Sequence, residues 1–132
     1  MQIGEYEIKD DLKYDSNNNW IKVEGDTATF GISDVGVKKA KDIAFIELPA
    51  QGTRVEANKN CGQIESAKWA GELKAPVSGE IIEVNSGLAD DPAGINIDPY
   101  GAWIAKIRMD NPEEANSLMD AEGYGGFVNS KN

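Results

Sequence analysis

The sequence predicts a mainly β fold, a small sandwich or flattened β-barrel of two quasi-repeated halves, with short helices and a C-terminal helix. Two observations lead to this prediction. Short segments rich in β-branched and aromatic residues recur along the chain, separated by Gly, Pro, Asn and Asp. In addition, one pattern occurs twice in the middle of the chain, as "PAQGTRVEAN" from Pro49 and as "PVSGEIIEVN" from Pro76.

The two copies of this pattern match in register. Proline, glycine, a β-branched residue, glutamate and asparagine recur at one fixed interval, in the pairs Pro49/Pro76, Gly52/Gly79, Val55/Ile82, Glu56/Glu83 and Asn58/Asn85. A fixed interval indicates one supersecondary unit used twice, and two strand-rich units that bury a shared apolar face form a sandwich or barrel. Lys68 lies between the copies, so we expect it on a rigid, exposed turn that joins the halves.

The elements before the repeat follow from local signals. "WIKVEGDTATFGIS" (20–33) is rich in β-formers and is broken at Gly25-Asp26, which predicts two strands joined by a hairpin turn. Ser33 or Asp34 is then placed to cap a short helix through "VGVKKAK" (35–41). "DIAFIELP" (42–49) predicts a strand that ends at Pro49.

After the repeat, "WIAKIRM" (103–109) predicts another strand. A helix over about 112–122 follows, because Pro112 suits a first helical position and glutamates come next, with Gly123 as its stop. The chain of 132 residues is long enough for one domain, so we expect a single domain over 1–132 with its core at about 20–109.

Charge limits the partners. Thirteen basic and 23 acidic residues give a formal net charge of −10, which repels phosphate backbones and anionic membrane faces. We therefore expect no nucleic-acid or membrane partner, and we expect basic protein surfaces instead. The chain has no apolar run long enough to cross a membrane and no signal segment, so a cytoplasmic location is expected.

The side chains available for chemistry are few. The chain has no histidine, the usual general base and the commonest metal ligand, and a single cysteine cannot form an internal disulfide or a thiolate cage. Asp90, Asp91 and Asp98 surround a Pro-Gly loop and are interpreted as solvated, so no metal site is expected. Cys61 is interpreted as a small buried hydrophobe, with a role in disulfide exchange as the weaker alternative. We expect a protein that is not an enzyme.

The remaining feature is Lys68 itself. Most lysines are simply solvated, and a Schiff-base lysine needs a pocket that lowers its pKa, which an exposed turn does not provide. A rigidly presented amine is, however, a good site for covalent attachment of a carrier group by another enzyme.

The segment 62–81 resembles the lipoyl-lysine region of the glycine cleavage system H protein family. The family's Glu-Ser-Val-Lys stands here as Glu65-Ser66-Ala67-Lys68, and its Pro-Val-Ser-Gly as 76–79. "GISD" (31–34), "DIAFIELPAQGTRV" (42–55), "DPYG" (98–101) and "LMDAEGY" (118–124) also look like family segments, so the resemblance extends from about 20 to 124.

The resemblance implies a biotinyl/lipoyl-carrier-type fold and a non-catalytic function, with lipoic acid attached covalently to Lys68. It implies that Glu65 and Gly79 are recognised by the lipoylating enzyme. Three further residues flank the arm: Ser66, Ala67 and Trp69. Biotin is disfavoured as the attached group, because biotinyl lysines usually lie between methionines.

The partners implied are a lipoate ligase or lipoyl transferase, dihydrolipoamide dehydrogenase, glycine decarboxylase and aminomethyltransferase. In the glycine system, the loaded arm carries a cationic aminomethyl group that retracts into a cleft, held by polar and acidic residues near the first strand. We expect a monomer, because a shuttle must dock and leave.

The sequence also departs from the family. Asparagines in "DSNNNW" (15–20) replace the family's histidine and glutamate, Trp69-Ala70-Gly71 follows the lysine, and Lys74 replaces an aromatic residue. "KWAG" is similar to H-protein-like lipoate-binding proteins that act with heterodisulfide-reductase-like complexes in sulfur oxidation. The alternatives are therefore a lipoyl carrier of sulfur intermediates and, second, an unlipoylated structural or regulatory homologue.

Overall fold

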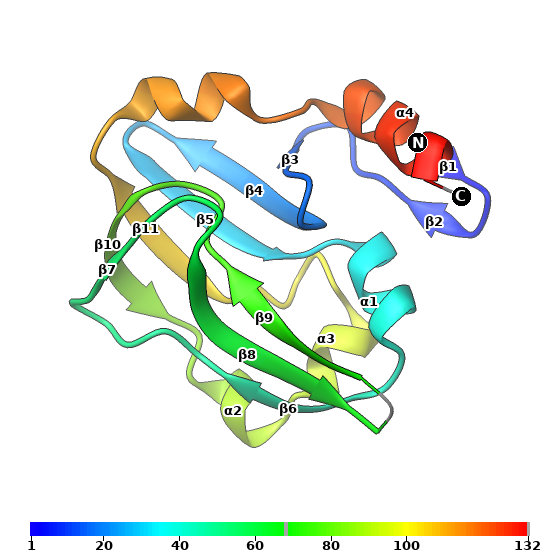
Figure 1. Cartoon of the computed structure of the whole chain (residues 1–132), viewed down its shortest axis with the longest axis horizontal. Coiled ribbons are helices and arrows are strands. Elements are labelled where there is room, and N and C mark those ends of the chain that lie inside the picture. The colour runs from blue at the N-terminus through cyan, green and yellow to red at the C-terminus, as the bar shows by residue number, and fades with distance from the viewer. Residues whose placement is uncertain (68, 132) are drawn as a thin grey trace.

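The protein is mainly β, as the sequence predicts. The structure, a computed structural model, describes residues 1–67 and 69–131. Three antiparallel sheets are present in these residues, with short helices between the strands and a helix near the C-terminus (Figure 1). In this part of the chain no helix combines the length and hydropathy that a membrane span requires.

The largest sheet has six strands in the order β3-β4-β5-β11-β10-β7. Their bounds are β3 Lys13–Tyr14, β4 Asn19–Glu24, β5 Thr27–Ile32, β7 Arg54–Val55, β10 Gly79–Val84 and β11 Ala105–Met109. The β4–β5 hairpin turns at the predicted Gly25-Asp26, where Gly25 has a φ of 63°, a left-handed conformation that glycine adopts without strain. The predicted strand over 103–109 is confirmed in the shorter form of β11.

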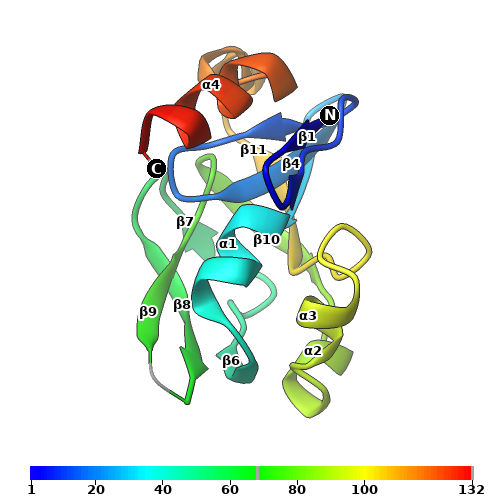
Figure 2. The ribbon, with the colours of Figure 1, turned by 90° about the vertical axis from the view of Figure 1, so that its right-hand side faces the viewer.

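A second sheet has three strands in the order β6-β8-β9, with β6 Ile43–Glu47, β8 Asn60–Ser66 and β9 Ala70–Lys74. Its inward side chains share one hydrophobic core with the six-stranded sheet: Ile46, Ile64 and Leu73 belong to the same cluster as Phe30, Ile81 and Ile107. The two sheets form two layers (Figure 2). Neither sheet closes on itself within the described residues, so the sandwich alternative fits and the barrel does not.

The two copies of the repeat lie side by side. β7 pairs antiparallel with the start of β10, Val55 opposite Gly79 and Arg54 opposite Glu80, so both copies are in the six-stranded sheet. This differs from the expectation that each copy builds one half of the fold. The chain between them leaves this sheet, forms the β8–β9 hairpin in the other layer and returns.

The first helix is confirmed. α1 spans Asp34–Ala40, and the Ser33 hydroxyl accepts a hydrogen bond from the Gly36 N–H at 3.3 Å, the predicted cap. Two further short helices, α2 Gly87–Asp90 and α3 Gly94–Ile97, connect β10 to β11 and were not predicted.

The helix predicted over 112–122 is two separate elements. A 3₁₀ helix, η1, spans Pro112–Ser117, and α4 spans Ala121–Lys131. Between them the backbone is extended, because Met119 makes a β-bridge with Tyr14. Gly123 lies in the first turn of α4 rather than at the end of a helix, and its N–H donates to the Asp120 carboxylate at 2.8 Å. The expected stop at Gly123 was therefore wrong.

The core also extends beyond the expected 20–109. A small third sheet, β1 Gln2–Ile3 with β2 Tyr6–Glu7, and α4 enclose a second cluster of buried residues: Ile8, Tyr14, Trp20, Val35, Ala121, Tyr124 and Val128. The rings of Tyr14 and Tyr124 stack at 4.4 Å between centroids, and this contact joins α4 to the edge of the six-stranded sheet.

Candidate functional site

The β8–β9 hairpin organises the site. Glu65 pairs with Ala70 and Gln63 with Glu72, so the two strands approach the connection in antiparallel register. The Ser66 N–H donates to the Trp69 carbonyl at 2.7 Å and closes the hairpin. Lys68 lies outside the described residues, but its neighbours Ala67 and Trp69 are both exposed. The connection on which Lys68 stands therefore begins and ends at solvent-accessible residues.

Four of the predicted site residues lie together at this end of the hairpin: Glu65, Ser66, Ala67 and Trp69. Glu65 is half-buried, and its carboxylate accepts a hydrogen bond from the Gln63 amide at 3.0 Å along the same strand. This bond orients the acidic group beside the connection.

Gly79 is not part of this group. It is buried at the start of β10 in the other sheet, where a Cβ would lie 2.1 Å from the Arg108 carbonyl oxygen. Close approach of the β11 backbone therefore requires a glycine at this position. Its repeat partner Gly52 has a φ of 87°, a conformation that favours glycine, so the two glycines are needed for different reasons.

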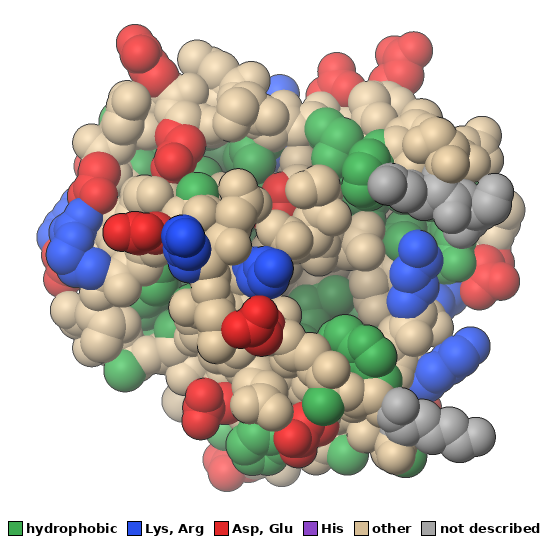
Figure 3. Space-filling model, viewed as in Figure 1, with side chains coloured by type: hydrophobic (Ala, Val, Ile, Leu, Met, Phe, Trp, Pro, Cys, Tyr) green, Lys and Arg blue, Asp and Glu red, His purple; other side chains and the backbone are tan. Residues whose placement is uncertain are grey.

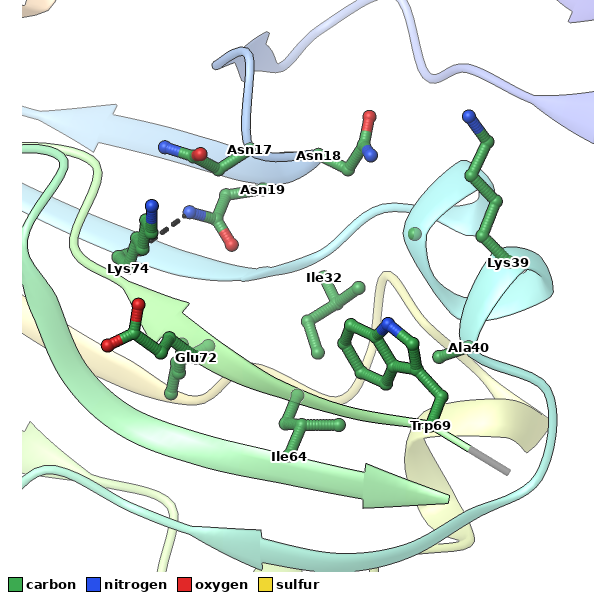
Figure 4. A pocket seen from close by; sticks show the side chains of 12 residues that line it. Asn17, Asn18, Asn19, Ile32, Lys39, Ala40, Ile64, Trp69, Glu72 and Lys74 are labelled. Atoms are coloured by element: carbon green, nitrogen blue, oxygen red, sulfur yellow. Dashed lines mark hydrogen bonds between the residues drawn. The ribbon is translucent and has the colours of Figure 1, made fainter. Parts of the chain in front are cut away.

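Trp69 folds back over its own strand. A Cβ on Gly71 would lie 2.3 Å from Cζ2 and 2.5 Å from Cη2 of the Trp69 indole, so the ring occupies the space that a side chain at position 71 would need. The indole is 47% exposed and faces a cavity between the hairpin and the six-stranded sheet (Figure 4).

This cavity has a volume of about 280 Å³. Its walls come from the loop before β4, from β5, α1, β8 and β9 (Figure 4). The apolar part of the lining consists of Ile32, Ala40, Ile64, Trp69 and Leu73, and the polar part of Asn17, Asn18, Asn19, Lys39, Glu72 and Lys74. A cavity with apolar walls and a few polar groups suits a hydrocarbon chain that ends in a polar or charged group.

The asparagine wall is held in place by Asp15, a residue that the sequence did not single out. The buried Asp15 carboxylate accepts hydrogen bonds from the backbone N–H groups of Asn17 and Asn19, at 2.9 and 3.0 Å, and from the Asn19 amide at 2.9 Å. Burial raises the pKa of Asp15, although these bonds act in the opposite direction.

Asn18 and Asn19 are also structural. The Asn19 amide donates to the Lys74 carbonyl at 2.8 Å and so links the start of β4 to β9. Asn18 adopts a left-handed φ of 64°, which asparagine tolerates better than most residues, and accepts a hydrogen bond from the Tyr124 hydroxyl at 2.7 Å. The polar groups near the first strand therefore shape the cavity wall.

A second hollow, of about 480 Å³, lies beside the first and is lined by Lys39, Ala40, Lys41, Asp42, Ser66, Ala67 and Trp69. Trp69 lines both hollows, so its side chain borders each of the two spaces beside the connection.

Cys61 does not fit a reactive role. It is half-buried near the start of β8, away from the connection, and burial raises the pKa of its thiol to about 12. The thiol therefore stays protonated near neutral pH and is a poor nucleophile. In the described part of the chain, no three His, Cys, Asp or Glu side chains gather as metal ligands would.

The fold and the hairpin define a class, the two-layered β protein of the H-protein type. A crystal structure of a glycine cleavage system H protein from Mycobacterium marinum superposes with a TM-score of 0.84 at 36% sequence identity, covering 92% of this chain and 99% of that one. Residues 12–131 match the family described as "Glycine cleavage H-protein". The chain belongs to the glycine cleavage H-protein family.

Curated relatives agree with this assignment. A probable glycine cleavage system H protein from Pyrococcus abyssi is 47% identical over 132 residues, covering 98% of each chain. Glycine cleavage system H protein 1 from Caldanaerobacter subterraneus is 43% identical over 121 residues, covering 92% of this chain and 97% of the relative.

Proposed function

We propose that this protein is the lipoyl carrier of a glycine cleavage system and that Lys68 bears the lipoyl group. The observation that supports this most directly is the β8–β9 hairpin, whose connection contains Lys68 between two exposed neighbours and adjoins a cavity of about 280 Å³. Family membership supports glycine cleavage as the pathway, because the relatives carry that system's name.

The residues around the hairpin fit a lipoyl arm. A lysine side chain and a lipoyl chain together reach on the order of 10–15 Å from ordinary bond lengths, enough to enter the adjacent cavity. Ile64, Trp69 and Leu73 provide apolar surface for the hydrocarbon chain and the sulfur-containing ring. When bound, lipoate supplies a disulfide that can be reduced and reoxidised, and a thiol that can carry an aminomethyl group.

The chain's own part is to present and shelter the arm. Glu72 is the carboxylate in the cavity lining, and the asparagine amides provide acceptor oxygens for a cationic aminomethyl group. Asp15 and Asn19 keep that wall fixed against β9, so the cavity exists before the arm enters it. None of these groups forms an acid–base pair for catalysis, so we assign the protein a carrier role.

The partners follow from this role. A lipoate ligase or lipoyl transferase attaches the group and contacts Glu65, whereas Gly79 acts through the close packing of β10 on β11. Glycine decarboxylase, aminomethyltransferase and dihydrolipoamide dehydrogenase then engage the arm in turn. The net charge of −10 favours basic faces on these cytoplasmic partners.

The proposal is tested by lipoylation of the purified protein. Incubation with lipoate, ATP and a lipoate ligase should add one lipoyl mass, located by peptide mapping on Lys68. Lys68→Arg should abolish the adduct, and Lys59→Arg, a change at an exposed lysine before β8, should not. Failure of the wild-type chain to accept lipoate, under conditions that modify another H protein, would refute the proposal.

One feature of the cavity supports a second candidate, a carrier of sulfur intermediates. Lys39 and Lys74 line the cavity together with a single carboxylate, Glu72, and two ammonium groups favour an anionic cargo over a cationic one. The lipoylated protein should be offered in parallel to glycine decarboxylase and to a heterodisulfide-reductase-like complex. Turnover with the second complex alone would select the sulfur pathway.

A further inference from the structure

The three-stranded sheet has an outer face, turned away from the core, and the carrier role described above uses only two of its residues, Glu65 and Glu72. Strand register defines this outer face as two rows of side chains. Phe45, Glu65 and Ala70 form the row nearer the connection, and Glu47, Gln63 and Glu72 form the next row. Of these six, only Glu65 is half-buried, and the others are exposed.

A β-bulge places Phe45 on this face. Ile43 pairs with Ser66 and Phe45 with Glu65, so two residues of β6 stand opposite one residue of β8. Side chains of a regular strand alternate, which would put positions 43 and 45 on the same face. Because of the bulge, Ile43 and Ile46 are both buried, at 4% and 2% exposed, while Phe45 is 47% exposed.

The outer face is acidic around this ring. Its six residues include three glutamates and no basic side chain, and Glu72, on the edge strand β9, also lines the cavity beside Lys74. In Figure 3, acidic and hydrophobic side chains alternate over the lower part of the molecule, where β6, β8 and β9 lie in Figure 1. An exposed aromatic ring within a carboxylate rim complements a protein surface that has an apolar pocket bordered by lysine or arginine.

We propose that the outer face is the docking surface for the enzyme that acylates Lys68, with Phe45 inserted into an apolar pocket. The proposal rests on the proposed function, because it requires that Lys68 be acylated. In that step Lys68 Nζ forms an amide bond with the lipoyl carboxyl carbon, the bond from that carbon to its ATP-derived activating group breaks, and Nζ loses its proton to solvent.

The acylating enzyme is the occupant that we infer, because the outer face adjoins the connection that this enzyme must reach. An interface of ordinary size covers about 800 Å² on each partner, far more than a hairpin end offers, so the enzyme must also cover a neighbouring surface. Glu65 is three residues from Lys68, within about 10 Å, and pairs directly with Phe45. On the opposite side of the hairpin lie Lys39 and Lys41, which would repel a basic partner.

The test measures the rate of lipoylation against the concentration of unmodified protein, by intact mass with lipoate, ATP and ligase. Phe45→Ala should raise KM at least about tenfold and leave kcat nearly unchanged, as expected for a lost docking contact. Ile97→Ala is the matched control, because Ile97 is 81% exposed on α3, outside the sheet, and its KM should not change. Thermal unfolding establishes that each variant is folded.

Charge gives an independent readout. Glu47→Lys on the outer face and Glu24→Lys on β4 alter the net charge equally, and both sites are exposed. Only Glu47→Lys should raise KM and reduce its dependence on salt.

The outcomes separate the two proposals. If the wild-type chain is not lipoylated, the proposed function fails. If it is lipoylated and Phe45→Ala has an unchanged KM, the docking surface is refuted and the carrier role stands. A variant that is lipoylated normally but turns over poorly with glycine decarboxylase would likewise overturn the assignment of this face to the acylating enzyme.

Discussion

At residue scale, Trp69 and Gly71 depend on each other. The indole lies where a side chain at position 71 would be, so Gly71→Ala must push the ring away from the cavity wall. We expect the variant's tryptophan emission to shift to longer wavelength as the ring becomes more hydrated, with a loss of about 1–3 kcal/mol in the free energy of unfolding. In a Trp69→Ala background the same alanine should produce no emission shift. A shift that persists in that background would contradict the contact.

The second prediction at this scale concerns Asp15. Burial holds its pKa in the folded protein above the ordinary value of 3.8, so the folded state binds a proton more readily than the unfolded chain does. Protonation of this carboxyl therefore stabilises the fold, and the contribution is lost as the pH rises through the folded-state pKa. We expect the unfolding free energy of wild type, relative to Asp15→Asn, to be larger at pH 4 than at pH 7. Denaturant titrations at the two pH values check this, and a constant or opposite difference would refute it.

Sequence reasoning at residue scale succeeded where the signal was local. The position of Lys68 between the two copies of the repeat predicted an exposed turn, and the described residues on either side of it, Ala67 and Trp69, are exposed. It failed for Asp15. This carboxylate has its role because the following loop folds around it and donates hydrogen bonds to it, and nothing in "DSNNNW" indicates that it is buried. The asparagines were interpreted as a departure from the family that pointed to a different cargo, whereas Asn18 and Asn19 also have structural hydrogen bonds, to Tyr124 and to β9.

At the scale of elements, one hydrogen-bond chain joins α1 to α4. The Tyr124 hydroxyl donates to Asn18, so the buried Ser33 hydroxyl donates to Tyr124 at 2.8 Å while it accepts from the Gly36 N–H. Ser33→Ala removes the helix cap and one buried hydrogen bond, and we expect a loss of about 1–2 kcal/mol. Urea unfolding measures it.

A double-mutant cycle then isolates the link between the two helices. Tyr124→Phe should cost about 1 kcal/mol alone, and the double variant should lose less than the sum of the single losses by about 0.5–1 kcal/mol. Strict additivity would mean that the two hydroxyl groups do not cooperate.

The C-terminal region shows why element boundaries escaped prediction. Pro112 and the following acids do start a helical turn, but the chain must become extended at Met119 to bridge to Tyr14. That bridge is a contact between distant parts of the sequence, and no local pattern encodes it. The same holds for β7 and β10, because the repeat revealed two related segments without showing that they pair with each other.

At the scale of the whole molecule, the net charge of −10 predicts how the carrier meets its partners. Long-range attraction to basic faces accelerates encounter and is screened by salt, with a Debye length of about 10 Å at 0.1 M and about 3 Å at 1 M. We expect kcat/KM of dihydrolipoamide dehydrogenase for the lipoylated protein to fall as salt rises, with a much smaller change in kcat. Free lipoamide, which lacks the acidic body, is the control, and an equal decline for both substrates would contradict electrostatic steering.

The extra residue in the β6 bulge, Ala44, has a consequence for which deletions this strand can accept. With one residue too many for strict alternation, the strand keeps two isoleucines in the interior and one phenylalanine outside. Deleting Ala44 would bring the strand back into phase with β8, because Ile43, Phe45 and Ile46 would then be consecutive and would alternate inside, outside and inside. A chain shortened there could keep both its packing and its outward ring, so the facing of these side chains survives loss of the bulge.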